Sequence, residues 1–232
     1  MHRVVIGQMR KFTAAAVFGM LLFCFSATVR AQVAVDKTVA TVSDGVMTEL
    51  ITLSDLKWQL ALQPGVQLSP PSSEDLNRAL QLQINQRIFA LEAERLPRTP
   101  PTEQEINNKI NEILGYFPTT AEFERRLNTV GFSSVKDDNF ERIIAQRVAI
   151  DKYLDFRFRS FIVITAEDEA KYYREIFVPE FRTNSPGQLM PTLDAKRSEI
   201  NRTLTEDRVA AQIEAFLDEA KRRIQTVILS PV

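Results

Sequence analysis

Cysteine and histidine are almost absent from this chain of 232 residues. The sequence contains one cysteine, Cys24, and one histidine, His2. Without a later cysteine, the remainder of the chain forms no disulfide, no zinc-thiolate site and no thiol nucleophile. Without a later histidine, it has no Ser-His-Asp triad and no histidine-ligated metal. We therefore expect no cofactor, no metal and no catalytic residue, and a stability that comes from a packed hydrophobic core.

The first 31 residues are organised like a cleavable secretory signal peptide. A basic start is followed by an apolar run over 14–25 and by a cleavage-like pattern that ends at Ala31. We expect cleavage after Ala31, a mature chain that begins at Gln32, and a periplasmic location. An uncleaved membrane anchor is the competing interpretation, which the shortness of the apolar run disfavours.

The charge of the mature chain argues against nucleic acid as a partner. Four of the 29 basic residues and none of the 30 acidic ones precede Gln32, which leaves 25 basic and 30 acidic residues, a balance of minus five. A mildly acidic chain is a poor candidate for binding nucleic acid. The bases and aromatics that alternate in Arg157–Phe161 do not change this expectation, because residues two apart on a helix do not share a face.

Capping signatures predict where most of the helices begin. A Ser or Thr side chain accepts a hydrogen bond from the amide three residues later, and an acid at that later position reaches back to the cap. The six such pairs are Thr52/Asp55, Ser72/Asp75, Thr102/Glu105, Thr119/Glu122, Ser134/Asp137 and Thr165/Asp168. Apolar residues at helical spacing follow each pair. Helices are expected from about 135 towards 158, over 166–176 and from 193 to about 224, so the fold class is mainly α.

Segments rich in β-branched residues lie near both ends of the mature chain. Val35–Val42 predicts a strand, Val46–Ile51 a second one after a turn, and Gln225–Leu229 a third. A strand without a neighbour leaves its backbone donors and acceptors unpaired. We therefore expect the N-terminal and C-terminal strands to pair as a small antiparallel β element of a multi-helix core.

The segment FVPEFRTNSPGQLMP, Phe177–Pro191, contains three prolines and a glycine between two predicted helices. Its composition predicts an irregular connector, although most connections between helices are shorter. We expect residues 178–191 to be a linker. It would join a helical domain over 32–177 to a C-terminal helix and strand over 192–232 that complete the same core.

The order of these segments resembles that of the SurA-like periplasmic chaperones. The likeness begins with VDKTVATVSDGVMTELITLSDL at Val35–Leu56 and includes ITAEDEAKYYREIF at Ile164–Phe177. It ends with LDAKRSEINRTL and IEAFLDEAKRRIQTVIL, so it covers nearly the whole mature chain. Members of that family typically carry one or two parvulin-type prolyl isomerase domains where this chain has only the linker 178–191. The resemblance therefore implies the chaperone core of the family without its isomerase.

A chaperone core of this kind implies an ATP-independent holdase that is not an enzyme. Its partners would be unfolded outer-membrane or periplasmic polypeptides held in an apolar cleft, with no small-molecule substrate. The alternatives are a prolyl isomerase and a structural or assembly subunit of an envelope complex, including a homodimer. Apolar side chains in or beside the linker and at a helix end are expected to contact clients, because such groups can repack around different sequences. They are Tyr116, Phe117, Phe177, Phe181, Leu189 and Met190.

Overall fold

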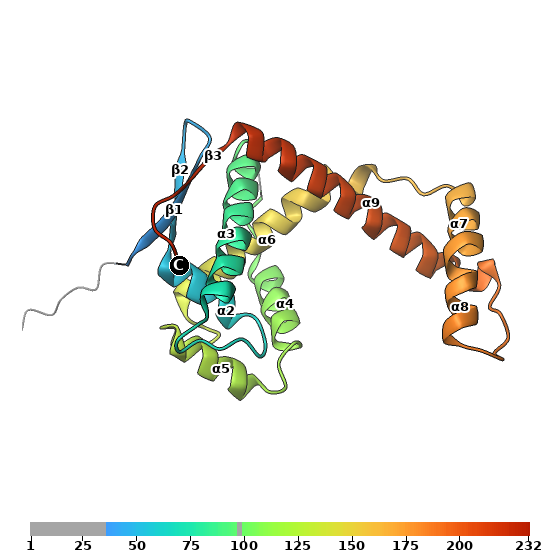
Figure 1. The fold of residues 1–232 in the computed structure, drawn as a ribbon, viewed down its shortest axis with the longest axis horizontal. Coiled ribbons are helices and arrows are strands. Elements are labelled where there is room, and N and C mark those ends of the chain that lie inside the picture. The colour runs from blue at the N-terminus through green and yellow to red at the C-terminus, as the bar shows by residue number, and fades with distance from the viewer. Residues whose placement is uncertain (1–35, 97–98) are drawn as a thin grey trace, which may run out of the picture. The chain divides into compact units, whose positions relative to one another are not determined.

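The described part of the chain is mainly α-helical and carries a small antiparallel sheet, as the sequence predicts (Figure 1). The structure is a computed structural model, and it describes residues 36–96 and 99–232. The expected signal peptide and its cleavage site lie outside the described residues. Within residues 36–96 and 99–232, no helix has both the length and the apolar character needed to cross a membrane.

The sheet of the described chain has three strands in the order β2-β1-β3. Their bounds are β1 Thr38–Ser43, β2 Thr48–Thr52 and β3 Gln225–Ile228. The turn between β1 and β2 is held by Asp44, whose Oδ1 accepts hydrogen bonds from the amides of Val46 and Met47 at 2.9 and 2.8 Å. β3 pairs antiparallel with β1, with Ala40 opposite Ile228. The predicted pairing of the N-terminal and C-terminal strands is therefore confirmed.

The described residues form eight α-helices. They are α2 (Leu53–Ala61), α3 (Ser73–Glu94), α4 (Glu103–Leu114), α5 (Thr120–Thr129), α6 (Asp138–Arg157), α7 (Ala166–Tyr172), α8 (Val178–Asn184) and α9 (Leu193–Arg223). A 3₁₀ turn, Arg159–Phe161, follows α6, and a π-helix, Tyr173–Phe177, joins α7 to α8.

Five of the six predicted caps stand at the start of a helix. In α2, α3, α4, α5 and α7 the predicted Ser or Thr accepts a hydrogen bond from the amide three residues later. The sixth prediction, Ser134/Asp137, is wrong. Asp137 itself caps α6, because its Oδ1 accepts from the amides of Asn139 and Phe140 at 3.0 and 3.4 Å. The helix therefore begins about three residues later than the sequence pattern suggests.

The prediction that residues 178–191 form an irregular linker is wrong in its first half, because Val178–Asn184 forms α8. Proline inside a helix lacks an amide donor and clashes with the carbonyl four residues earlier. The π-helix that directly precedes Pro179 has wider turns, in which the amide of Val178 bonds to the carbonyl of Tyr173. The helical path thereby continues past Pro179. The irregular segment is only residues 185–192.

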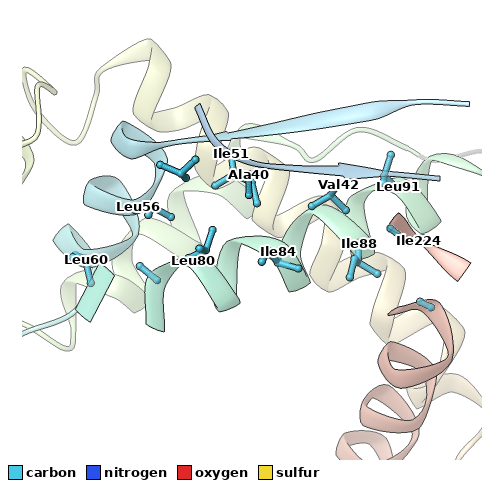
Figure 2. Close-up of a cluster of buried hydrophobic side chains, with 13 residues drawn as sticks. Ala40, Val42, Ile51, Leu56, Leu60, Leu80, Ile84, Ile88, Leu91 and Ile224 are labelled. Atoms are coloured by element: carbon cyan, nitrogen blue, oxygen red, sulfur yellow. The ribbon is translucent and has the colours of Figure 1, made fainter. Parts of the chain in front are cut away.

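The first of three core clusters lies between the sheet, α2, α3 and the end of α9. Figure 2 shows Ala40, Val42 and Ile51 of the sheet close to the Leu and Ile side chains of α3. Ile224, which follows α9, belongs to the same cluster. Because Ile224 directly precedes β3, the cluster ties the C-terminal part of the fold to its first strands.

The second cluster fills the space between α4, α5 and α6. Phe123 and Phe140 are fully or almost fully buried in it, with ring centroids 5.9 Å apart. The third cluster joins α3, α6 and α9, and Phe216 of α9 lies at its centre. The C-terminal half of α9 is therefore packed on the helical core, whereas its N-terminal half contacts α7.

Candidate functional site

Three aromatic rings lie in a row along the helical path from α7 to α8. The ring centroids of Tyr173 and Phe177 are 5.5 Å apart, and those of Phe177 and Phe181 are 5.8 Å apart. Both pairs are stacked, with interplanar angles of 17° and 26°. The hydroxyl of Tyr173 donates to the carbonyl oxygen of Pro191 at 2.6 Å, so the end of the 185–192 segment lies against this row. We call these three rings the aromatic row.

An open pocket of about 230 Å³ lies between α8 and α9, beside the aromatic row. Its apolar lining consists of Tyr172, Phe177, Phe181 and Ile200. Its polar lining consists of Glu180, Asn184, Ser185, Glu199 and Thr203. We call it the α8–α9 pocket. The aromatic rings come from α7, the π-helix and α8, whereas Glu199, Ile200 and Thr203 come from α9, so the pocket exists only because these segments pack together.

The electrostatic environment of the α8–α9 pocket is negative. Burial raises the pKa of Tyr172, and the nearby carboxylates of Glu180, Asp207 and Glu199 raise it further. Glu199 accepts a hydrogen bond from Lys196 at 2.7 Å, and this contact lowers the pKa of Glu199. Glu180 has no ion-pair partner among the described residues. The pocket therefore holds one carboxylate that is already paired and one that is free.

Polar contacts hold α7 against α9 and so position the pocket. The buried carboxylate of Glu169 accepts hydrogen bonds from Arg197 at 2.8 Å and from Asn201 at 2.9 Å. Arg208 pairs with Asp168 at 2.7 Å and donates to the carbonyl oxygen of Val163 at 2.7 Å. Among the described residues, no group of three or more His, Cys, Asp or Glu could hold a metal ion. Asp168 and Glu169, in the first turn of α7, thus form contacts between α7 and α9.

A second concave region lies between α6 and α9. Its volume is about 360 Å³, and Leu154, Val209 and Ile213 supply apolar lining. Arg159 and Glu206, which form an ion pair at 2.8 Å, also line it. Both pockets are lined in part by α9. Residues 199–203 of that helix line the α8–α9 pocket, and residues 206–213 line the second region.

The structure brings two of the six predicted contact residues together, namely Phe177 and Phe181 in the α8–α9 pocket. Leu189 and Met190 lie in the 185–192 segment, where Leu189 is 93% exposed and Met190 is half-buried, and neither lines the pocket. Tyr116 is exposed at the end of α4, where its hydroxyl donates to Glu112.

The expectation that Phe117 is an accessible contact residue is wrong. Phe117 is only 6% exposed and belongs to the core cluster of α4, α5 and α6. Its ring centroid lies 4.7 Å from that of Phe123. The position before Pro118 suggested a free helix end, but α5 folds back over this turn and covers the ring.

Several residues of the pocket were not predicted as contact residues. Ile200 lies in the helix expected from 193 to about 224, but nothing in the sequence indicated that this residue would face α8. The spacing of four residues between Tyr173, Phe177 and Phe181 was an available signal, because it indicates one side of a continuous helix. The prediction gave more weight to the proline-rich composition of Phe177–Pro191, in which Pro179 lies between two of these rings, than to that spacing.

Comparison with known proteins does not identify a family for this chain. The resemblance to the SurA-like chaperones rests on the order of the sequence segments and stays a prediction. A scan for known protein families and a search among curated proteins each found no match.

Proposed function

We propose that the protein is an ATP-independent periplasmic holdase that binds unfolded outer-membrane or secreted polypeptides. The observation that carries this proposal is the α8–α9 pocket, an open cavity with three aromatic rings in its lining. Holding a client requires no catalytic group, only an accessible apolar surface and contacts weak enough to be released. The order of the sequence segments, which resembles that of the SurA-like chaperones, points to the same function.

The other exposed apolar groups favour a protein that handles extended chains. Leu50 and Val227 lie on the same face of the sheet, since each stands opposite Thr41 of β1, and they are 52% and 38% exposed. Exposed apolar side chains that gather on one face, as these two do, are common on surfaces that bind other proteins.

Aggregation of a urea-unfolded outer-membrane porin tests the proposal. On dilution of the porin from urea, an equimolar amount of the purified protein is expected to suppress the increase in light scattering. The double variant Phe177→Ser/Phe181→Ser removes two rings of the pocket and is expected to suppress much less.

The matched control is Phe156→Ser/Phe161→Ser, which removes two equally large rings that do not line the pocket. This control is expected to suppress aggregation as the unmodified protein does, and all three proteins should have similar thermal unfolding midpoints. Absence of suppression by the unmodified protein would contradict the holdase proposal. An equal loss in both double variants would assign the activity to general surface apolarity rather than to the pocket.

A role as an assembly subunit is the second candidate, and the exposed edge of the sheet favours it. All four residues of β3 are exposed, and Gln225–Ile228 contains no charged residue or proline. Proteins commonly protect a free edge strand with such residues. In this role two copies would pair along β3, and the molar mass from light scattering would be that of a dimer rather than of a monomer.

We propose no isomerase activity. The segment between α8 and α9 is residues 185–192, which is far too short to fold an isomerase domain.

A further inference from the structure

Every polar side chain that lines the α8–α9 pocket can accept a hydrogen bond, and none carries a positive charge. Glu180 and Glu199 supply carboxylates, and Asn184, Ser185 and Thr203 supply amide or hydroxyl oxygens. The remaining lining is aromatic or aliphatic. A positively charged group is attracted both by carboxylates and by the face of an aromatic ring.

We propose that the α8–α9 pocket binds the side chain of an arginine or lysine within an extended client segment. This inference rests on the proposed holdase function and specifies which client side chain the pocket accepts. The aliphatic part of the basic side chain would lie along the rings of Phe177 and Phe181, and its charged end would meet Glu180. Long basic side chains commonly bury their methylene groups against apolar surface in this manner.

The protein already contains one contact of the proposed kind at the same place. The Nζ atom of Lys196 lies 5.9 Å from the centroid of the Phe177 ring and 2.7 Å from a carboxylate oxygen of Glu199. One lysine thus pairs with one carboxylate and one ring of the pocket. The remaining carboxylate, Glu180, and the remaining rings, Tyr172 and Phe181, have no such cation among the described residues. Glu180 and these rings could therefore bind a second cation through the same kinds of contact that Lys196 makes with Glu199 and Phe177.

The size of the pocket agrees with a single side chain as its occupant. At about 230 Å³ it is smaller than the roughly 300–1,000 Å³ typical of sites for drug-sized ligands. It is open to solvent on one side, as binding of a side chain from an extended polypeptide requires. The negative environment that also raises the pKa of Tyr172 favours a basic side chain over an acidic or a purely apolar one.

Peptide binding measured by fluorescence anisotropy tests the inference. The probe is a short labelled peptide in which valine and serine alternate around one central arginine. The reference peptide carries citrulline, which has nearly the shape of arginine without its charge, at the same place. We expect the arginine peptide to bind about fivefold to tenfold more tightly, and this preference to shrink at high salt.

Three variants of the full protein locate the effect. Glu180→Gln should remove most of the preference for arginine, and Lys196→Met should increase the affinity for the arginine peptide by freeing Glu199 and the ring of Phe177. Glu175→Gln makes the same charge change at an exposed position that does not line the pocket, and should leave the preference unchanged.

The outcomes separate this inference from the proposed function. Equal affinity for both peptides, or an equal effect of Glu175→Gln and Glu180→Gln, would overturn the inference while leaving the holdase intact. Failure to bind either peptide, together with failure to suppress porin aggregation, would overturn both. Weaker binding of the arginine peptide by Lys196→Met would also contradict the proposed occupant.

Discussion

Replacing Phe216 by alanine is expected to lower the free energy of unfolding by about 3–5 kcal/mol, the usual cost of removing a buried phenylalanine ring. Phe216 is 6% exposed, and its ring centroid lies 6.4 Å from that of Phe89 on α3 and 5.5 Å from that of Phe158. The guanidinium carbon of Arg157 lies 4.5 Å from the same centroid. The substitution would leave a cavity at the point where α9 meets α3 and α6.

Urea denaturation followed by circular dichroism measures this effect, and Phe156→Ala is its matched control. Phe156 is 64% exposed on α6, so its substitution should change the free energy of unfolding by no more than about 0.5 kcal/mol. Similar losses of unfolding free energy in the two variants would contradict the position of Phe216 at the centre of the cluster between α3, α6 and α9. Because α9 also forms one wall of the α8–α9 pocket, Phe216→Ala should weaken client holding indirectly, in proportion to the unfolded fraction.

Replacing Arg126 by alanine is expected to lower the free energy of unfolding by about 3 kcal/mol, because it leaves several partly buried carbonyl oxygens without a donor. The guanidinium of Arg126 donates to the carbonyl oxygens of Leu60, Gln63 and Val66, each at 2.8 Å, and to that of Ala61 at 3.0 Å. Burial lowers the pKa of this guanidinium, and the nearby carboxylate of Glu122 offsets only part of that effect.

The neighbouring Arg125 offers a control of the same residue type on the same helix. Arg125 is exposed, and its replacement by alanine should change the free energy of unfolding by no more than about 0.5 kcal/mol. Arg126→Lys should recover only a small part of the loss, since an ammonium group cannot reach four carbonyl oxygens as the guanidinium fork does. Full rescue by lysine would show that charge, rather than the hydrogen-bond geometry, accounts for the effect.

Local signals in the sequence predicted most of the secondary structure. Side-chain caps act within three residues, so Thr52, Thr102 and Thr165 could be identified as helix starts without knowledge of the tertiary fold. The pairing of β1 with β3 was also predictable, because unpaired strands are costly wherever they lie. The late start of α6 was not, since Ser134 and Asp137 both favour caps and only the folded turn decides between them.

The candidate site was harder to predict because it depends on contacts between distant segments. Phe177 and Phe181 were selected as residues of a loose connector, and they are instead residues of the π-helix and α8. Their pocket needs Ile200 and Glu199 from α9, and no periodicity within one helix indicates which other helix it will contact. Phe117 was misassigned for the same reason, because its covering by Phe123 is a tertiary contact.

Site-directed photo-crosslinking tests most directly whether the α8–α9 pocket contacts an unfolded client. A photoreactive phenylalanine analogue is placed at Phe181, and in a second protein at Phe156, which is exposed but outside the pocket. Each protein is irradiated with a urea-diluted porin. We expect strong crosslinking from position 181, which an excess of the arginine peptide reduces, and weak crosslinking from position 156. Equal crosslinking from the two positions, or none from position 181 in a protein that still suppresses aggregation, would contradict client binding in the α8–α9 pocket.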